Sequence, residues 1–521
     1  MLHHFISTVA IVLGASLTSI GQLTIDWNLS LGGSNTDRPR QVVSTLDGGS
    51  LIVGRSSSVD LDFGVGLGGA DGVVLKLDSS GEMEWFNRYG GSDDDSLDDV
   101  VTLSDGSCIV VGSSASADGD LSSNHGGYDF WILKLTSDGD VVWSVNYGGS
   151  HDDKATTATV TQTDQIVVLG QSQSDDVDVS VNHGQSDVWL LTLSNEGMLE
   201  WEKTLGGSSY EDPSDVIELA DGGFMVLAGT ESIDFDVSSN YSGQSGDGED
   251  CWVVKLDHTG EIIWDQNFGG SGEDSPDKLI QSEDGNYIIC GRTSSQDFDV
   301  TDLQGSNDGW IFKIDGEAQL IWSRALGGSE TDWVRSIVQA QDGGYFFAGY
   351  SESSDGLVQG NYGGHDCWFG KLSEAGLLLW SQNLGGSSDD RASSMSIQEN
   401  GTIVVAGYST SSDFDVEENN GGYDFWLFGL TPDETEGFWN LPPPLLFELY
   451  PNPASDQVTI RSQGSIECLE LLDAQGRIQQ RVQVSRNVHV LDLSHLNRGV
   501  YSLRATFEAT GMEHTQRFVL R

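Results

Sequence analysis

The stretch LDSSGEMEWFNRYGGS, residues 77–92, decides the fold of this chain, because variants of it recur at a nearly fixed interval. It consists of a turn rich in Asp, Ser and Gly, an alternating run around Trp85, and a closing Gly-Gly-Ser. The central tryptophan returns after gaps of 58, 58, 58, 63, 58 and 58 residues, at Trp27, Trp85, Trp143, Trp201, Trp264, Trp322 and Trp380. Such self-similarity indicates one supersecondary unit that is copied and stacked.

Each repeat contains four short apolar runs separated by turn residues. Between Trp85 and Trp143 the further runs lie near 97–103, 107–112 and 129–135. Gly, Asp, Ser and Asn between the runs are the residues that tight hairpins use. Four antiparallel strands per copy indicate the blade of a β-propeller. Gly-Gly-Ser begins at residues 32, 90, 148, 206, 269, 327 and 385, and an acid opens the fourth run at Asp71, Asp129, Asp187, Asp250, Asp308, Asp366 and Asp424, so we expect seven blades.

The order of the runs also predicts how the ring closes. The chain begins with an outermost-type strand near 23–31, whereas the last repeat provides runs near 392–398, 402–408 and 424–430. We expect the first strand to complete the seventh blade, which would leave no open sheet edge. The alternative is that a strand around Trp439, one residue out of register, completes this blade instead.

The charge of the chain is extreme and unevenly distributed. The formal net charge is -57, yet residues 445–521 carry eight Arg and eight acids, so the preceding part holds 16 basic and 73 acidic residues. This surface repels nucleic acid and anionic lipid, which excludes nucleic-acid partners. It is compatible with cation binding and with simple solubility.

The N-terminus has the pattern of a secretory signal peptide over residues 1–21, with an apolar stretch from Phe5 to Leu17 and a small-x-small site before Gln22. No other stretch has the roughly 20 apolar residues of a membrane span. The five cysteines are too few and scattered for a disulfide framework, and Cys251 and Cys367, in the same slot of two repeats, are expected to be small buried hydrophobes.

The C-terminal part is a different module. Residues 442–446 form a proline-rich linker after a propeller at 22–441, and the patterning of 447–521 predicts a β-sandwich of about seven strands. Its motifs are Asp473-x-x-Gly-Arg477 and, for sorting, Tyr450, Pro451, Asn452, Pro453, Gly499 and Tyr501. They resemble the type A sorting domain of the type IX secretion system of Bacteroidota. The resemblance implies recognition by that machinery, passage through the periplasm, and secretion or display on the outer membrane.

The turn-plus-tryptophan segments, such as Leu256 to Trp264, resemble the docking motif of quinoprotein-type propellers. This resemblance supports the fold, and nothing in the sequence supports a quinone cofactor. Six further tryptophans occupy one slot of the fourth run, and a residue repeated in every blade is expected to be core between blades.

Closely spaced acids suggest a possible cofactor, calcium. Asp-x-Asp motifs recur in the loop after the third run, and an acid follows each Gly-Gly-Ser, so we expect an acidic face on the ring. Hard cations take six to eight oxygen ligands, whereas Asp also caps turns through its own backbone amides. Both interpretations stay open, and the calcium candidates are Asp118, Asp120, Asp176, Asp178, Asp297, Asp299, Asp413 and Asp415.

The departures from the repeat are the best candidates for function. They are the insertion 242–248, the dipeptide Asp212-Pro213, and Trp333, which with Asp332 is the candidate contact for a surface glycan or protein ligand. The sequence contains no serine nucleophile elbow, metal-binding His pair or phosphate loop. We therefore expect an exported binding or scaffold propeller, and the alternative is a secreted enzyme such as a polysaccharide hydrolase.

Overall fold

The computed structural model describes residues 23–241, 248–358, 360–432, 447–450, 457–462, 466–473, 477–483, 488–507 and 513–520. The expected signal peptide, the proline-rich linker, Trp439 and most of the insertion, 242–247, lie outside the described residues. Within the described residues the structure consists of β-strands and one short 3-10 helix, η1 (Leu61–Phe63). No helix of this part is long and apolar enough to cross a membrane.

Seven four-stranded antiparallel sheets make up the repeat region. The innermost strands are β2 (Asp37–Ser44), β6 (Asp95–Thr102), β10 (Asp153–Val160), β14 (Glu211–Glu218), β18 (Asp274–Gln281), β22 (Asp332–Gln339) and β26 (Asp390–Ile397). The second strands are β3 (Ser50–Ser56), β7 (Cys108–Ser114), β11 (Ile166–Ser172), β15 (Phe224–Thr230), β19 (Tyr287–Thr293), β23 (Tyr345–Ser351) and β27 (Ile403–Ser409).

The outer half of each sheet follows the same pattern. The third strands are β4 (Asp71–Leu77), β8 (Asp129–Leu135), β12 (Asp187–Leu193), β16 (Asp250–Leu256), β20 (Asp308–Ile314), β24 (Asp366–Leu372) and β28 (Asp424–Pro432). The outermost strands are β5 (Met83–Tyr89), β9 (Val141–Tyr147), β13 (Leu199–Leu205), β17 (Ile262–Phe268), β21 (Leu320–Leu326), β25 (Leu378–Leu384) and β1 (Leu23–Leu31).

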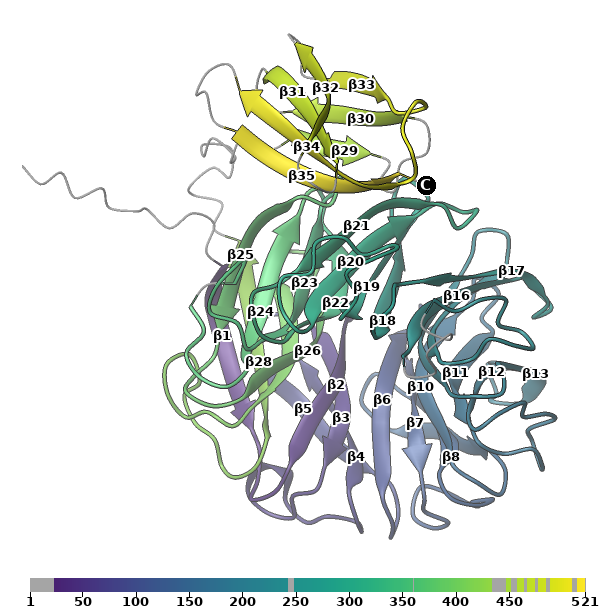
Figure 1. The fold of residues 1–521 in the computed structure, drawn as a ribbon. Coiled ribbons are helices and arrows are strands. Elements are labelled where there is room, and N and C mark those ends of the chain that lie inside the picture. The colour runs from purple at the N-terminus through teal and green to yellow at the C-terminus, as the bar shows by residue number, and fades with distance from the viewer. Residues whose placement is uncertain are drawn as a thin grey trace, which may run out of the picture.

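The sheets are arranged as blades around a ring (Figure 1). The innermost strand of each blade contacts the innermost strand of the next, and β26 contacts β2, so the ring is closed. The β-propeller predicted from the repeat is confirmed.

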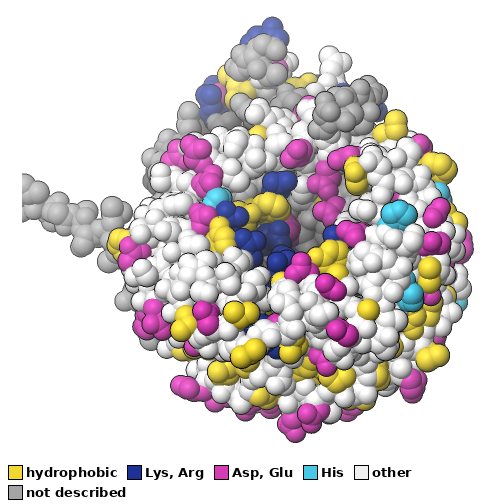
Figure 2. Space-filling model, turned by 90° about the horizontal axis from the view of Figure 1, so that it is seen from below, with side chains coloured by type: hydrophobic (Ala, Val, Ile, Leu, Met, Phe, Trp, Pro, Cys, Tyr) yellow, Lys and Arg dark blue, Asp and Glu magenta, His cyan; other side chains and the backbone are white. Residues whose placement is uncertain are grey.

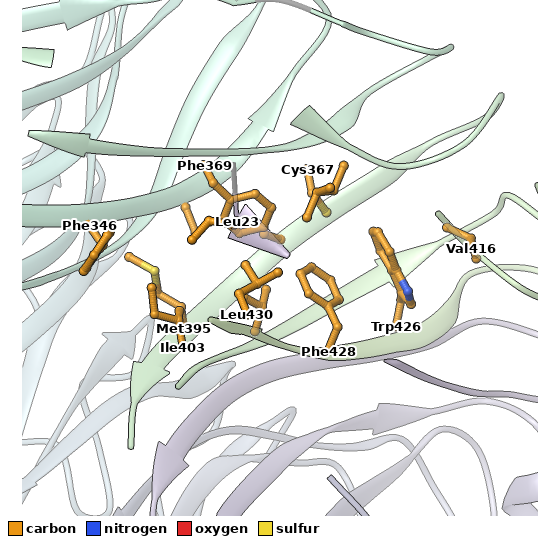
Figure 3. Close-up of a cluster of buried hydrophobic side chains, with 14 of the residues drawn as sticks. Leu23, Phe346, Cys367, Phe369, Met395, Ile403, Val416, Trp426, Phe428 and Leu430 are labelled. Atoms are coloured by element: carbon orange, nitrogen blue, oxygen red, sulfur yellow. The ribbon is translucent and has the colours of Figure 1, made fainter. Parts of the chain in front are cut away.

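Ring closure uses the first strand of the chain. β1 pairs with β28 along its length, from Leu23 opposite Pro432 to Leu31 opposite Phe425. The Leu23 side chain is buried in a cluster that contains Phe428 of the same blade and Phe369 of the preceding one (Figure 3). The expectation that the N-terminal strand completes the seventh blade is confirmed.

The two sets of repeated tryptophans pack between blades. The third-strand set is fully buried: Trp131, Trp189, Trp252, Trp310, Trp368 and Trp426. An outer-strand tryptophan contacts a glycine turn of the next blade: a Cβ added at Gly81 would lie 2.2 Å from the Trp27 ring, and Gly139 and Gly197 lie against Trp85 and Trp143 in the same way. The Trp85 indole N–H also donates to the carbonyl of Ser137 in that turn (3.1 Å). The tryptophans are therefore structural, as their repetition indicated.

The C-terminal strands form two further sheets. One contains β29 (Phe447–Tyr450), β30 (Gln457–Ser462) and β33 (Val488–Asp492), and the other contains β31 (Ile466–Asp473), β32 (Ile478–Gln483), β34 (Gly499–Phe507) and β35 (Glu513–Leu520). Val458 and Leu491 of the first sheet share one core with Leu471 and Leu503 of the second. This is the small β-sandwich that the sequence predicted.

A glycine substitution tests the contact between blades. Gly81 has φ +86 and lies against Trp27, whereas Gly106 has φ +85 and would meet nothing within 4 Å. Alanine at either position costs about 1–2 kcal/mol for its left-handed backbone. Only Gly81→Ala also forces a side chain into the ring, so we expect it to lose about 1–3 kcal/mol more in denaturant unfolding. Equal losses for Gly81→Ala and Gly106→Ala would contradict this packing.

Candidate ligand-binding site

The aspartates predicted to bind calcium hold the backbone of neighbouring loops. The first acid of each Asp-x-Asp accepts the amide of the Gly-Gly-Ser serine, as in Ser92 N–H to Asp118 (2.8 Å), and the second accepts the amide of the first glycine, as in Gly90 N–H to Asp120 (3.0 Å). The same two bonds are formed by Asp176 and Asp178, by Asp297 and Asp299, and by Asp413 and Asp415.

These bonds join residues 26 and 30 positions apart, so the acids connect neighbouring loops, which differs from the expected capping of their own turns. In the described part of the chain, no group of three or more His, Cys, Asp or Glu side chains has the arrangement of a metal site. Calcium binding by these loops stays a prediction.

The expected acidic face is wrong for the acids that follow Gly-Gly-Ser, because the ring of β-sheets buries all of them. Asp95, for example, is 2% exposed, accepts the amide of Gly91 (2.7 Å), and is bound by the hydroxyls of Ser114 and Ser116. The equivalents are Asp37, Asp153, Glu211, Asp274, Asp332 and Asp390, all at most 1% exposed. Asp332 therefore offers no surface to a ligand, which leaves Trp333 as the member of the predicted pair that borders solvent.

The acids that open the third strands are buried as well. One oxygen of Asp129 accepts the amide of His125 (2.8 Å), while the other has no hydrogen-bond partner among the described residues. That free oxygen lies against Gly148, where an added Cβ would be 2.4 Å away. The first glycine of Gly-Gly-Ser is thus required by the close approach of a buried carboxyl group.

The residues that differ between blades line the central channel at one mouth. In each blade the second residue of the innermost strand faces a residue of the second strand, and we call these the channel pairs. They are Arg38–Arg55, Ser96–Ser113, Lys154–Gln171, Asp212–Gly229, Ser275–Arg292, Trp333–Tyr350 and Arg391–Tyr408.

The channel mouth is rich in cations although the protein is strongly acidic. The channel pairs contain five cations and one acid. Two further arginines, Arg40 and Arg335, stand two residues after a channel position on β2 and β22. Figure 2 shows Lys and Arg side chains gathered in the hollow at the centre of the ring, with Asp and Glu side chains around it. Walls of low dielectric concentrate this positive potential.

Trp333 belongs to a packed group in this mouth. Its indole N–H donates to Asp277, and the guanidinium carbons of Arg292 and Arg335 lie 4.2 and 5.1 Å from the centre of its ring system. Arg335 also pairs with Asp277 (3.0 Å). Burial raises the pKa of Asp277 to about 6, and the Arg335 charge opposes this rise. Trp333 therefore positions two cations at the channel mouth.

Two hollows open at the mouth and share Gln171 and Asp212. The first, of about 320 Å³, is lined by residues of the first four blades and has charges of both signs, with Arg40, Arg55 and Lys154 beside Asp94, Asp95, Asp98 and Asp212. The second, of about 510 Å³, lies over blades three to five and has an acidic lining: Glu211, Asp212, Glu231, Glu249 and Glu273, with Arg292. Both volumes are in the range of small-molecule sites.

Glu249 is the acid of the second hollow whose pKa is raised to near neutrality. It directly precedes β16 at the end of the insertion, and its carboxyl group lies over Gly229, where a Cβ would be 1.7 Å away. Burial raises the pKa of Glu249 to about 7, and the charge of Asp212 raises it further, against a hydrogen bond from Ser275. Burial also raises the pKa of Asp212. These two carboxyl groups are the best candidates for acid-base chemistry in the described residues.

Sequence reasoning missed most of this mouth. It selected Asp212 and Trp333 as breaks in the repeat, and both lie there, but it overlooked the arginines and Glu249. The signal was present, because these positions change from blade to blade while their neighbours repeat. What the sequence did not show was that these positions face one channel.

The described sorting-motif residues stabilise turns of the C-terminal sandwich. The Tyr501 hydroxyl donates to the carbonyl of Asn497 (2.8 Å), which closes the turn before Gly499, whose φ is +154. Arg477 donates to Asp473 through its guanidinium (2.8 Å) and its amide (3.0 Å). Tyr450 ends β29, and Pro451, Asn452 and Pro453 lie outside the described residues.

Comparison with known proteins identifies the C-terminal module. Residues 448–521 match the family model of the secretion system C-terminal sorting domain. The regulatory protein FlaEY of Caulobacter vibrioides is 30% identical over 137 residues, which are 24% of this chain and 14% of that protein. The chain thus spans a small part of this relative.

Solved structures of low sequence identity are also similar to this chain. The WD40 domain of Neurospora crassa Pan2 is 11% identical, with 75% of this chain and 89% of that one covered and a TM-score of 0.43. PorZ, described as a surface component of the type IX secretion system of Porphyromonas gingivalis, is 11% identical, with 95% and 100% covered and a TM-score of 0.25. The strand topology and the C-terminal match together define a secreted β-propeller with a sorting domain.

The buried third-strand acids predict that this propeller is more stable at pH 5 than at pH 8. Burial raises the pKa of Asp129, Asp308 and Asp424 from 3.8 to about 6, and that of Asp366 to about 7. The folded state therefore binds more protons than the unfolded state between pH 4 and 7, so stability falls as pH rises through this window.

Thermal melting of variants at several pH values tests whether folding stability falls as pH rises. Asp366→Asn removes one buried group that must ionise as pH rises, so the variant should lose less folding stability between pH 5 and pH 8. We expect it to be more stable than the parent chain at pH 8 by on the order of 1–3 kcal/mol, since one pKa unit corresponds to about 1.4 kcal/mol. Asp78→Asn, at an exposed turn where hydrogen bonds from Ser80 lower the pKa, should leave the slope between pH 5 and 8 unchanged. A melting temperature that rises from pH 5 to pH 8 would show that the acids are held as stable anions.

Proposed function

We propose that this chain is an exported propeller, secreted or displayed on the cell surface, that binds a ligand at the channel mouth. The proposal rests on one observation: the residues that vary between blades converge on that mouth, whereas the repeated residues are committed to holding the ring. A residue that only stabilises a repeat is copied with it. Side chains that depart from the repeat and gather at one channel mouth are well placed to contact a ligand.

In this proposal the C-terminal domain directs the export of the protein. The match at 448–521 supports recognition by the type IX secretion machinery, with passage through the periplasm after removal of the expected signal peptide. The acidic outer surface keeps such a protein soluble and apart from anionic membrane lipids. The ligand would then be a glycan or protein encountered outside the cell.

Paired variants of the full chain test whether the channel mouth binds. Asp212→Asn with Lys154→Gln changes one acid and one cation at the mouth, whereas Asp138→Asn, in the exposed turn before β9, with Lys203→Gln, on the outermost strand β13, changes one acid and one cation away from it. On a glycan array and in capture of surface proteins, we expect the mouth variant to lose tenfold or more in affinity and the outer variant to bind normally. Equal binding by both variants would place the ligand elsewhere.

The carboxyl groups of the second hollow favour a second candidate, a hydrolytic enzyme. A glutamic acid with a pKa of about 7 can donate a proton at neutral pH, and glycosidases pair such an acid with a second carboxylate. Glu249 would be the acid and Asp212 its partner. No covalent nucleophile is needed if that partner activates water.

Hydrolysis assays with a panel of polysaccharides test this candidate. If the chain is an enzyme, Glu249→Gln should reduce turnover by about 10²–10⁴-fold, the range of general acid catalysis. Glu231→Gln, in the same hollow, should have a much smaller effect. Absence of turnover by the parent chain on every substrate would exclude the enzyme and leave the binding function.

A further inference from the structure

The loops between the second and third strands expose bulky apolar side chains at a position whose backbone favours glycine. The position directly follows the first acid of each Asp-x-Asp motif, or Asp355 in blade six, and it has a φ between 50° and 70° in every blade. We call the residues at this position the loop-tip residues. They are Leu61, Gly119, Val177, Phe235, Phe298, Gly356 and Phe414.

Folding alone does not account for the bulky loop-tip residues. A left-handed backbone is unfavourable for a side chain with a Cβ, most of all for a β-branched one such as Val177. Gly119 and Gly356 show that the loop accepts glycine at this position. The five bulky loop-tip side chains are nevertheless 47–69% exposed, so little of their apolar surface is buried in return. Backbone strain of this kind persists at sites that serve function.

Aromatic rings of the preceding blade enlarge the exposed apolar surface. Tyr241 of blade four stacks on Phe298 of blade five, with 4.8 Å between the ring centres. Tyr362 of blade six stacks in the same way on Phe414 of blade seven (5.0 Å). In both pairs the planes of the rings are inclined by 26°, and both phenylalanines stay exposed. The apolar tips of consecutive blades are thereby joined.

The bulky loop-tip residues form two arcs on the face of the channel mouth, separated by the glycines of blades two and six. One arc covers blades three to five and the other covers blades seven and one. Further exposed apolar side chains lie in the same loops: Val181 and Ile233 in the first arc, and Val59 and Val65 in the second. Figure 2 shows hydrophobic side chains on this face around the central hollow, with Asp and Glu side chains among them. Exposed apolar surface of this extent indicates an interaction site.

The charge of the same loops is of one sign. The seven loops contain 21 acids and no Lys or Arg: 57–70, 115–128, 173–186, 231–249, 294–307, 352–365 and 410–423. An exposed aspartate directly precedes each bulky loop-tip residue, as Asp176 precedes Val177 and Asp234 precedes Phe235. The apolar arcs are therefore surrounded by negative potential.

This combination selects a class of partner. A second copy of this chain, an anionic lipid surface or an acidic polysaccharide would be repelled by the acids. Leu61, Val177 and Ile233 offer no ring on which a sugar could stack, whereas the apolar side chains of a protein pack on aliphatic and aromatic groups alike. Protein interfaces have an apolar core and a polar rim, and a Lys or Arg beside an exposed Phe interacts with the ring as well as with carboxylates.

We propose that the two arcs dock a basic segment of another protein, in which Lys or Arg residues alternate with apolar ones. Its apolar side chains cover the loop-tip residues, and its cations lie beside the flanking aspartates. This surface is made by the loops around the mouth and is separate from the channel pairs, so the proposal goes beyond binding in the mouth.

Calorimetric titration of the full chain tests the docking surface with three synthetic peptides of equal length. One alternates Leu with Lys, one alternates Ser with Lys, and one alternates Leu with Glu. We expect the Leu/Lys peptide to bind at least tenfold more tightly than each of the others, with affinity that falls as salt rises. Binding of the Ser/Lys peptide at equal affinity would show a general attraction for cations and would overturn the proposal.

Charge-neutral variants then locate the binding. Phe235→Gly/Phe298→Gly removes two tips of the first arc and should weaken binding of the Leu/Lys peptide tenfold or more. Ile263→Ser/Leu379→Ser removes two exposed apolar side chains from the outermost strands β17 and β25 and should have no effect. The glycine variant should melt at or above the temperature of the parent chain, because glycine adopts a positive φ without strain. A clearly lower melting temperature would show that the tips hold the loops together and would contradict the proposal.

The remaining outcomes identify a different occupant or separate the two proposals. If Phe235→Gly/Phe298→Gly loses binding on a glycan array but keeps the Leu/Lys peptide, the arcs bind a glycan and the proposal is wrong. If the parent chain sediments as a dimer and this variant as a monomer, the occupant is a second copy. The Asp212→Asn/Lys154→Gln variant should bind the Leu/Lys peptide as the parent chain does, so the mouth and the arcs succeed or fail independently.

Discussion

The contact between the outer tryptophan of one blade and the glycine turn of the next is the constraint on which the ring depends. A single four-stranded sheet has two apolar faces and cannot bury both by itself. Packing Trp27, Trp85 and Trp143 onto Gly81, Gly139 and Gly197 fixes the spacing between successive blades, and the third-strand tryptophans fill the space between them. Because every blade needs two neighbours, the ring must close, and β1 meets this need by pairing with β28.

Closure of the ring uses most of the repeated polar side chains for structure, so few of them can contact a ligand. The acids after Gly-Gly-Ser and at the third-strand openings are inside the ring, where hydroxyls and amides satisfy most of their oxygens. The Asp-x-Asp acids hold the loops from outside. The channel pairs are not part of these contacts, and they change in charge and size from blade to blade. We therefore attribute stability to the repeated residues and recognition to the varied ones.

The sequence predicted the fold well because residues that recur at a fixed interval are those that pack between successive blades. The blades, the closing strand and the sandwich at 447–521 followed from spacing and turn chemistry. The acidic face was wrong, because a one-dimensional pattern does not show which side of a strand is buried: Asp95 and its equivalents were assigned to a loop face but belong to the interior. The channel mouth was found only in part, since Arg38, Arg292 and Glu249 come from distant segments of the sequence, and only the closed ring places their blades around one channel.

The central claim is that the repeated residues stabilise the ring and the varied residues of the mouth serve recognition. The most direct test is the free energy of unfolding of the Arg38→Ser/Arg55→Ser variant. These two substitutions give blade one the channel pair of blade two. If these arginines serve recognition alone, the double variant should be as stable as the parent chain or more stable, because two facing cations are removed. A variant that unfolds readily, with a loss of several kcal/mol, would show that the mouth holds the ring together and would contradict this account.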